Sequence, residues 1–134
     1  MTDEFSATLE RFLRLHIESF DELSVLLLVA SDSRQWTSAS LAQSLKMTPV
    51  AAESALGQLV ARALVAGPST SDGAYNYAPA SVDIDLMVKA LAVARREQPL
   101  ALTNVMNAQA MDRIRRAALK AFADAFKLRG PGNA

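Results

Sequence analysis

Apolar side chains recur at intervals of three and four residues along most of the chain, and this spacing predicts helices. The first such face belongs to an amino-terminal helix and comprises Phe5, Leu9, Phe12, Leu13, His16, Ile17 and Phe20. A second helix is expected to start at Ser19, because this hydroxyl and Glu22 three positions later form a capping-box pattern. The run LSVLLLVA that follows is apolar on nearly every side, so we expect this helix at the centre of the core.

Residues 36–65, WTSASLAQSLKMTPVAAESALGQLVARALV, predict two short amphipathic helices joined by a tight turn. Thr37 or Ser38 can cap the first of these helices, and Lys46 and Met47 form the turn. The side chains of the first helix that we expect to face inward are those of Leu41, Ala42 and Leu45. Trp36 precedes the pair, and we interpret it as a core or strand anchor in preference to a ligand-stacking residue.

The second helix of this pair has a strong start signal. Thr48 supplies a capping hydroxyl, and Pro49 follows at the first helical position, where a missing N–H is tolerated. We expect the helix to run to about Ala63. Its inward face would comprise Ala52, Leu56, Leu59 and Ala63, and its outward face Val50, Ala51, Glu53, Ser54, Gly57 and Gln58.

Two short strands and a turn-rich loop are predicted next. Residues 64–66 (LVA) form the first strand, the loop GPSTSDG suits a hairpin tip, and residues 74–78 (AYNYA) alternate and return as the second strand. The predicted fold class is therefore mainly α with a small β-hairpin wing.

The remainder of the chain predicts further helices. Ser81 caps a helix that ends at Gln98-Pro99, with Asp83 and Asp85 placed to favour its dipole. Residues 100–107 are ambiguous and are assigned to a short helix. Residues 111–128 form a final helix, whose inward side would comprise Met111, Ile114, Ala118, Phe122 and Ala125. We divide the chain into residues 1–80, residues 81–129 as a helical dimerisation segment, and a disordered tail at 130–134.

Composition excludes several classes of protein. The chain has 134 residues, no cysteine and one histidine, so disulfides and thiolate metal sites are absent and we expect no metal and no cofactor. No spacing suggests a catalytic group, and we expect no enzyme. The acidic amino terminus lacks the features of a signal peptide, and the longest apolar run, residues 25–30, is too short to cross a membrane. We therefore expect a cytoplasmic protein.

The net charge is zero but unevenly distributed. Residues 1–35 carry three bases and seven acids, residues 36–80 carry two of each, and residues 81–134 carry nine bases and five acids. Electrostatic attraction for nucleic acid would thus come from the last third of the chain.

The stretches WTSASLAQSLKMTPVAAESALGQLVARALVAG and GPSTSDGAYNYAP resemble the winged helix-turn-helix of MarR-like and GntR-like bacterial transcriptional regulators. The entry to the wing in those families matches Leu59, Arg62, Leu64 and Val65, although Ala63 stands where glycine is usual. The resemblance covers roughly residues 20–80. It implies the fold first and double-stranded DNA binding second, with the second helix of the motif in the major groove and the wing on the backbone.

Carried onto this sequence, the resemblance implies DNA contacts from Thr48, Ala51, Ser54, Gln58 and Arg62, and from Ser69, Ser71 and Asn76 on the wing. The motif departs from a typical reader of DNA because its outward face holds no arginine or asparagine, the residues that most often bind base edges in pairs of hydrogen bonds. Asp72 at the wing tip would also repel phosphate.

A stripe of bases on the final helix, Arg113, Arg116, Lys120 and Lys127, could supply the missing charge. It could follow a DNA backbone, meet the acidic third of a second subunit, or be a solvated face.

Two functions remain open. One is a homodimeric DNA-binding regulator with an interface of N- and C-terminal helices. The alternative is a winged-helix module that binds another protein through the small, weakly charged residues around Ala51 and Ser54.

Overall fold

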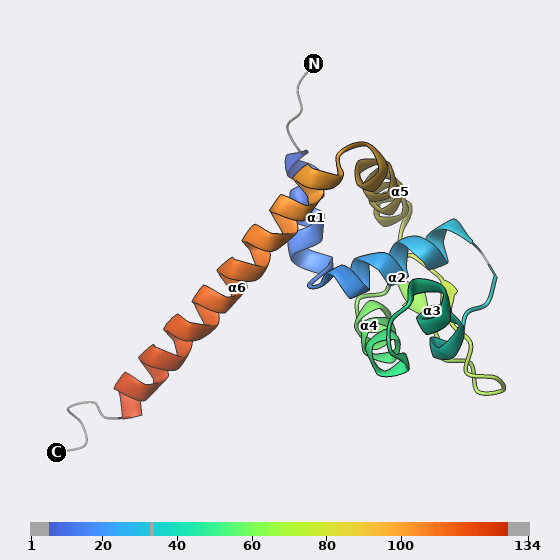
Figure 1. Cartoon of the computed structure of the whole chain (residues 1–134). Coiled ribbons are helices and arrows are strands. Elements are labelled where there is room, and N and C mark those ends of the chain that lie inside the picture. Colours follow the sequence, from blue (N-terminus) through green and yellow to red (C-terminus); the bar gives the residue numbers. More distant parts are fainter. Residues whose placement is uncertain (1–5, 33, 129–134) are drawn as a thin grey trace.

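The computed structural model describes residues 6–32 and 34–128 (Figure 1). The predictions for Phe5 and for a tail at 130–134 lie outside this range. The elements in chain order are α1 (Ala7–His16), α2 (Phe20–Ser31), α3 (Ser38–Leu45), α4 (Pro49–Ala61), β1 (Val65–Ala66), β2 (Asn76–Tyr77), α5 (Val82–Glu97) and α6 (Pro99–Leu128).

Helix α2 lies at the centre of the core, as its all-round apolar sequence predicts. Val25, Leu26 and Val29 are completely buried, and the helix packs against α3, α4, α5 and the second strand. The Ser19 hydroxyl caps it by accepting a hydrogen bond from the Glu22 backbone N–H at 3.1 Å. The reciprocal half of the expected capping box is displaced by one residue, because the Glu22 carboxylate accepts from the N–H of Glu18 and not from that of Ser19.

Helices α3 and α4 form the predicted helix-turn-helix. Thr37 caps α3 in a complete capping box with Ser40, and the turn is made possible by Lys46 in the left-handed conformation (φ 58°). Thr48 caps α4, with Pro49 in its first turn. The predicted end of α4 was wrong: the helix stops at Ala61, and Ala63 is exposed with a φ of 62° instead of facing inward. A left-handed residue cannot continue a right-handed helix, so Ala63 turns the chain toward β1.

The hairpin pairs β1 with β2 in antiparallel register, Val65 opposite Tyr77 and Ala66 opposite Asn76. Trp36 adds an isolated bridge to Tyr75 and is almost fully buried, which confirms its interpretation as a core and strand anchor. Gly67 turns the chain out of β1 with a φ of 132°. A Cβ at Gly67 would lie 2.7 Å from the Ala74 carbonyl oxygen, so the turn requires glycine.

The carboxyl-terminal third differs from prediction in two ways. Residues 100–107 and 111–128 are not separate helices, because α6 runs without interruption for 30 residues. Pro99 occupies the first helical position, and no glycine or proline falls within residues 100–128, so nothing in this stretch breaks the helix. The predicted inward side was also wrong. Met111, Ile114 and Phe122 are exposed, whereas Leu102 and Met106 on the opposite side are buried.

The molecule is therefore mainly helical with one small hairpin, a winged helix-turn-helix followed by two helices. Helix α5 packs on α1 and α2, and the first half of α6 packs on α1 and α5. The second half of α6 extends away from the rest of the molecule (Figure 1). Within the described residues, no helix combines the length and hydropathy needed to cross a membrane.

Candidate nucleic-acid interface

The outward face of α4 is built by burial of its other side. Ala52, Leu56 and Leu59 pack into the core, so Ser54, Gly57 and Gln58 are left exposed and Ala51 half-buried. Spacings of three and four residues bring Ala51, Ser54 and Gln58 onto one stripe, as expected for groove-facing residues. This stripe is flanked by Val50, which is 76% exposed, and by the carboxylate of Glu53.

Thr48 lies at the start of this face and is exposed. Its hydroxyl oxygen accepts a hydrogen bond from the Ala51 N–H at 3.1 Å. A hydroxyl that accepts one hydrogen bond can still donate its own hydrogen to a ligand oxygen. The residue therefore sets the start of α4 and offers one donor at the same time.

The wing carries the predicted polar residues on its surface. Ser69, Ser71 and Asn76 are all exposed. The Asp72 carboxylate, which would repel phosphate, has a structural partner at the tip: it accepts hydrogen bonds from the Ser69 hydroxyl and from the Ala74 N–H. The hydrogen bond from Ser69 lowers the pKa of Asp72 most, and the one from Ala74 lowers it further, so the carboxylate stays charged.

Arg62 does not belong to this face. It caps the end of α4, and its guanidinium turns inward to donate to the Glu22 carboxylate at 2.7 Å and to the His16 carbonyl at 2.9 Å. A second nitrogen lies 3.3 Å from a Glu18 carboxylate oxygen. The Arg62 side chain is only 18% exposed and is engaged with α1 and α2, so the ion pairs seen here would have to break for its predicted DNA contact to form.

The bases of the predicted stripe lie along one side of α6, but several of them form ion pairs with acids of the same helix. Arg116 and Arg115 contact Asp112 at 2.5 Å and 3.6 Å, and Lys120 lies 3.8 Å from Asp124. Arg113 donates to the Glu18 carbonyl at 2.6 Å. Because the helix repeats every 3.6 residues, the stripe continues the face that Leu102, Met106 and Gln109 bury against the body.

Two bases near the motif were not recognised as candidate contacts. Lys46, which the sequence assigned only to the turn, is exposed beside Thr48. Arg34 lies with its guanidinium 4.6 Å from the Trp36 ring centroid and 2.7 Å from an Asp32 carboxylate oxygen. Lys46 could have been found from the rule that turn residues of such motifs face outward. The placement of Arg34 depends on Trp36 joining the hairpin, which local sequence does not specify.

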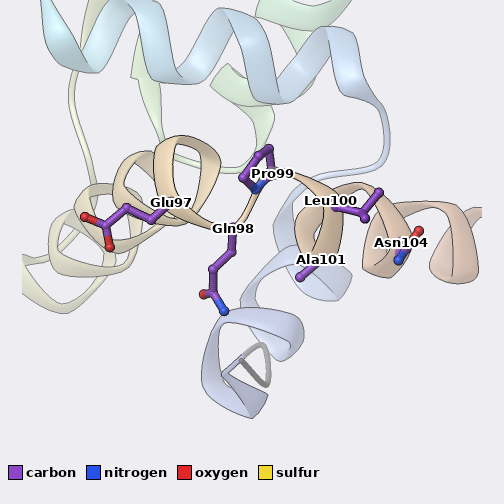
Figure 2. Close-up of a pocket in the computed structure, with 6 residues that line it drawn as sticks. All are labelled: Glu97, Gln98, Pro99, Leu100, Ala101 and Asn104. Carbon is purple, nitrogen blue, oxygen red and sulfur yellow. The ribbon is translucent and has the colours of Figure 1, made fainter. Parts of the chain in front are cut away.

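One further hollow on the surface lacks polar side chains that converge on a common point (Figure 2). Figure 2 shows this hollow of about 380 Å³ at the α5–α6 corner, where the side chains of Glu97 and Gln98 point in different directions. It is an open hollow whose other lining residues are Pro99, Leu100, Ala101 and Asn104. Among the described residues, no group of three or more His, Asp or Glu side chains is placed to hold a metal ion.

The comparisons with known proteins give a likeness of fold only. No family model and no curated protein matches the chain. Similar solved structures include an apo-form variant of ZitR from Lactococcus lactis, with 19% identity over 89% of each chain and a TM-score of 0.49. A MarR family protein of Mycobacterium tuberculosis has 20% identity over 86% of each chain and a TM-score of 0.48.

The adhesin competence repressor AdcR of Streptococcus pyogenes has 16% identity, covers 84% of this chain and 81% of its own, and has a TM-score of 0.48. ZitR is described as a zinc-responsive MarR family member. At these identities and TM-scores, none of these likenesses carries an argument about what this chain binds. None of these structures is a GntR-like regulator, so that part of the resemblance remains a prediction.

Proposed function

We propose that this chain is a DNA-binding transcriptional regulator of the winged helix-turn-helix type that acts as a homodimer. The observation that carries the proposal is the outward face of α4, where exposed Ser54 and Gln58 and half-buried Ala51 form a stripe of polar and small residues. Small side chains let a helix enter the major groove closely, and a glutamine amide can pair with the edge of adenine. Thr48 and Lys46 adjoin the stripe at the start of α4 and can contact phosphate.

The homodimer is supported by the second half of α6. Met111, Ile114, Leu119, Phe122 and Phe126 are each more than half exposed, and the two phenylalanine rings stack 5.6 Å apart. Such a large apolar face on a protruding helix needs a cover in water. A second copy would supply the same face and would place two α4 helices on one duplex, as dimeric readers of DNA require.

The proposal is tested by titrating a fluorescein-labelled duplex, enriched from a random-sequence pool, and following anisotropy at increasing salt. Affinity should fall as salt rises, and Gln58→Ala should weaken binding by about 1 to 3 kcal/mol if the amide reads a base. Asn107→Ala, an exposed amide on α6, is the matched control and should bind like the native chain. Absence of any enriched duplex at low salt would refute the proposal.

A second function is favoured by the charge on the motif. With Arg62 turned inward, Lys46 is the one base of residues 36–80 left exposed, against the exposed acids Glu53 and Asp72. A face of small, weakly charged side chains also suits close contact with a protein. In that case Ser54→Arg should abolish capture of a partner that co-purifies with the native chain, and retention of the partner would exclude this surface.

A further inference from the structure

The corner between α1 and α2, residues 17–19, is contacted by arginines from two distant parts of the chain. Arg62 reaches the Glu18 carboxylate from the end of α4, and Arg113 reaches the Glu18 carbonyl from the middle of α6. In Figure 1 the corner lies between α4 and α6, which are themselves well separated. Arginines at the end of the proposed reading helix and on the proposed dimer helix therefore both contact Glu18.

On the α4 side, the contact is a largely buried ion pair. The Glu22 side chain is 8% exposed and shares its Oε1 between Arg62, at 2.7 Å, and the Glu18 N–H, at 2.8 Å. Arg62 also donates to the His16 carbonyl, so one guanidinium contacts both the end of α1 and the start of α2. Breaking a buried pair of this kind leaves an uncompensated charge, which makes the position of Arg62 well defined.

On the α6 side, the contacts are hydrogen bonds to backbone carbonyls. Arg113 donates to Glu18 at 2.6 Å, and one turn earlier Gln109 donates to Glu10 at 2.9 Å. Both acceptors are backbone carbonyls, so these two hydrogen bonds link α6 to the backbone of α1 and of the corner. Arg116, which lies one turn beyond Arg113, pairs instead with Asp112 of its own helix.

Glu18 links the two sides. Its carboxylate faces Arg62, its carbonyl accepts from Arg113, and its N–H donates to Glu22. We propose that Glu18 and Arg62 are positioning residues that fix the end of α4 relative to α6, so that a change in α6 packing is transmitted to the helix that reads DNA. The inference rests on the proposed function only for the role of α4, since the coupling itself is a property of the free protein.

The test is hydrogen exchange of the full chain without DNA, resolved by NMR at the amides of Arg62, Ala63 and Leu64. These three amides donate to carbonyls within the last turns of α4 and report its end. Arg113→Ala should speed their exchange at least several-fold relative to buried amides of α2, although the substitution is on another helix. Glu18→Gln should act in the same way, and Arg113→Lys, which keeps a donor, should restore the slower rates.

Arg116→Ala is the matched control, because it removes a guanidinium one turn away that has no contact with the corner. It should leave the three amides unchanged. Equal rates in Arg113→Ala and Arg116→Ala would overturn the inference, and so would a uniform acceleration of α2 and α4 amides. Since DNA takes no part in this measurement, failure of duplex binding would remove the proposed function and leave the coupling standing, whereas unchanged exchange would remove the coupling alone.

Discussion

Ala63 has a left-handed backbone conformation that is unfavourable for a residue with a Cβ. It holds a φ of 62° between the end of α4 and β1, and its Cβ is disfavoured there. Glycine is usual at this place in the regulators that the sequence resembles, and a positive φ is a physical reason for glycine there.

Replacing Ala63 with glycine should stabilise the protein by up to about 1 kcal/mol, because relief of the Cβ crowding exceeds the added entropy of the unfolded chain. Urea denaturation followed by circular dichroism measures the change. Ala90→Gly, in the middle of α5, is the control and should cost about 1 kcal/mol or more. A loss of stability in Ala63→Gly would contradict the account of this turn.

His16 makes stability depend on pH near neutrality. Burial, and secondly the charge of Arg62, hold the pKa of His16 below its usual value. The unfolded chain therefore takes up a proton at a higher pH than the folded one, so stability should fall as pH drops below about 6.5.

Urea midpoints between pH 7.5 and 5.5 test this, with His16→Gln as the variant that should flatten the curve. The carboxyl groups of Asp32, Asp72 and Asp85 have pKa values lowered by their hydrogen bonds and titrate below this window. A urea midpoint of the native chain that stays constant from pH 7.5 to 5.5 would show that burial and the charge of Arg62 do not lower the pKa of His16.

At the scale of elements, local sequence signals predicted the caps and little of the tertiary pairing. The hydroxyls of Ser19, Thr37, Thr48 and Ser81 all cap the helices expected of them, because a cap depends on only a few neighbouring residues. The wing was predicted because turn residues separate two short apolar runs.

The inward side of α6 could not be predicted in this way. Its apolar face, with Phe122, is stronger than the face that packs on the body, so periodicity selected the wrong side. Arg62 was assigned to DNA because its partners, Glu18 and Glu22, lie some forty residues earlier in the sequence. Neither the packed side of α6 nor the ion pairs of Arg62 has a local signal in the sequence. The DNA-contact roles of Thr48, Ala51, Ser54, Gln58, Ser71 and Asn76 remain predictions.

The exposed face of α6 predicts the oligomeric state. Phe122→Glu should convert a dimer to a monomer in multi-angle light scattering, because a carboxylate would be buried without a partner in the interface. Val50→Glu, an exposed apolar residue at the other end of the molecule, should leave the mass unchanged. Truncation after Gln98 is a poor test, since it also removes Leu102 and Met106 from the core. An unchanged dimer in Phe122→Glu would exclude this face.

At the scale of the whole molecule, the helix proposed to read DNA and the helix proposed to form the dimer lie in different parts of the structure. Helix α4 and the hairpin lie at one end of the body, and the second half of α6 extends from the other side (Figure 1). The motif is poor in positive charge, so affinity for DNA would depend on few phosphate contacts and should respond strongly to a single added base.

The most direct test of the central claim compares the native chain with Ser54→Arg by anisotropy of a labelled duplex across a range of salt. If α4 faces the groove, the new guanidinium should raise affinity at low salt and steepen the salt dependence by about one unit of log–log slope. Gly57 and Gln58 beside it leave room for the longer side chain, and both are exposed. Equal and salt-independent anisotropy for both proteins would contradict DNA recognition by α4.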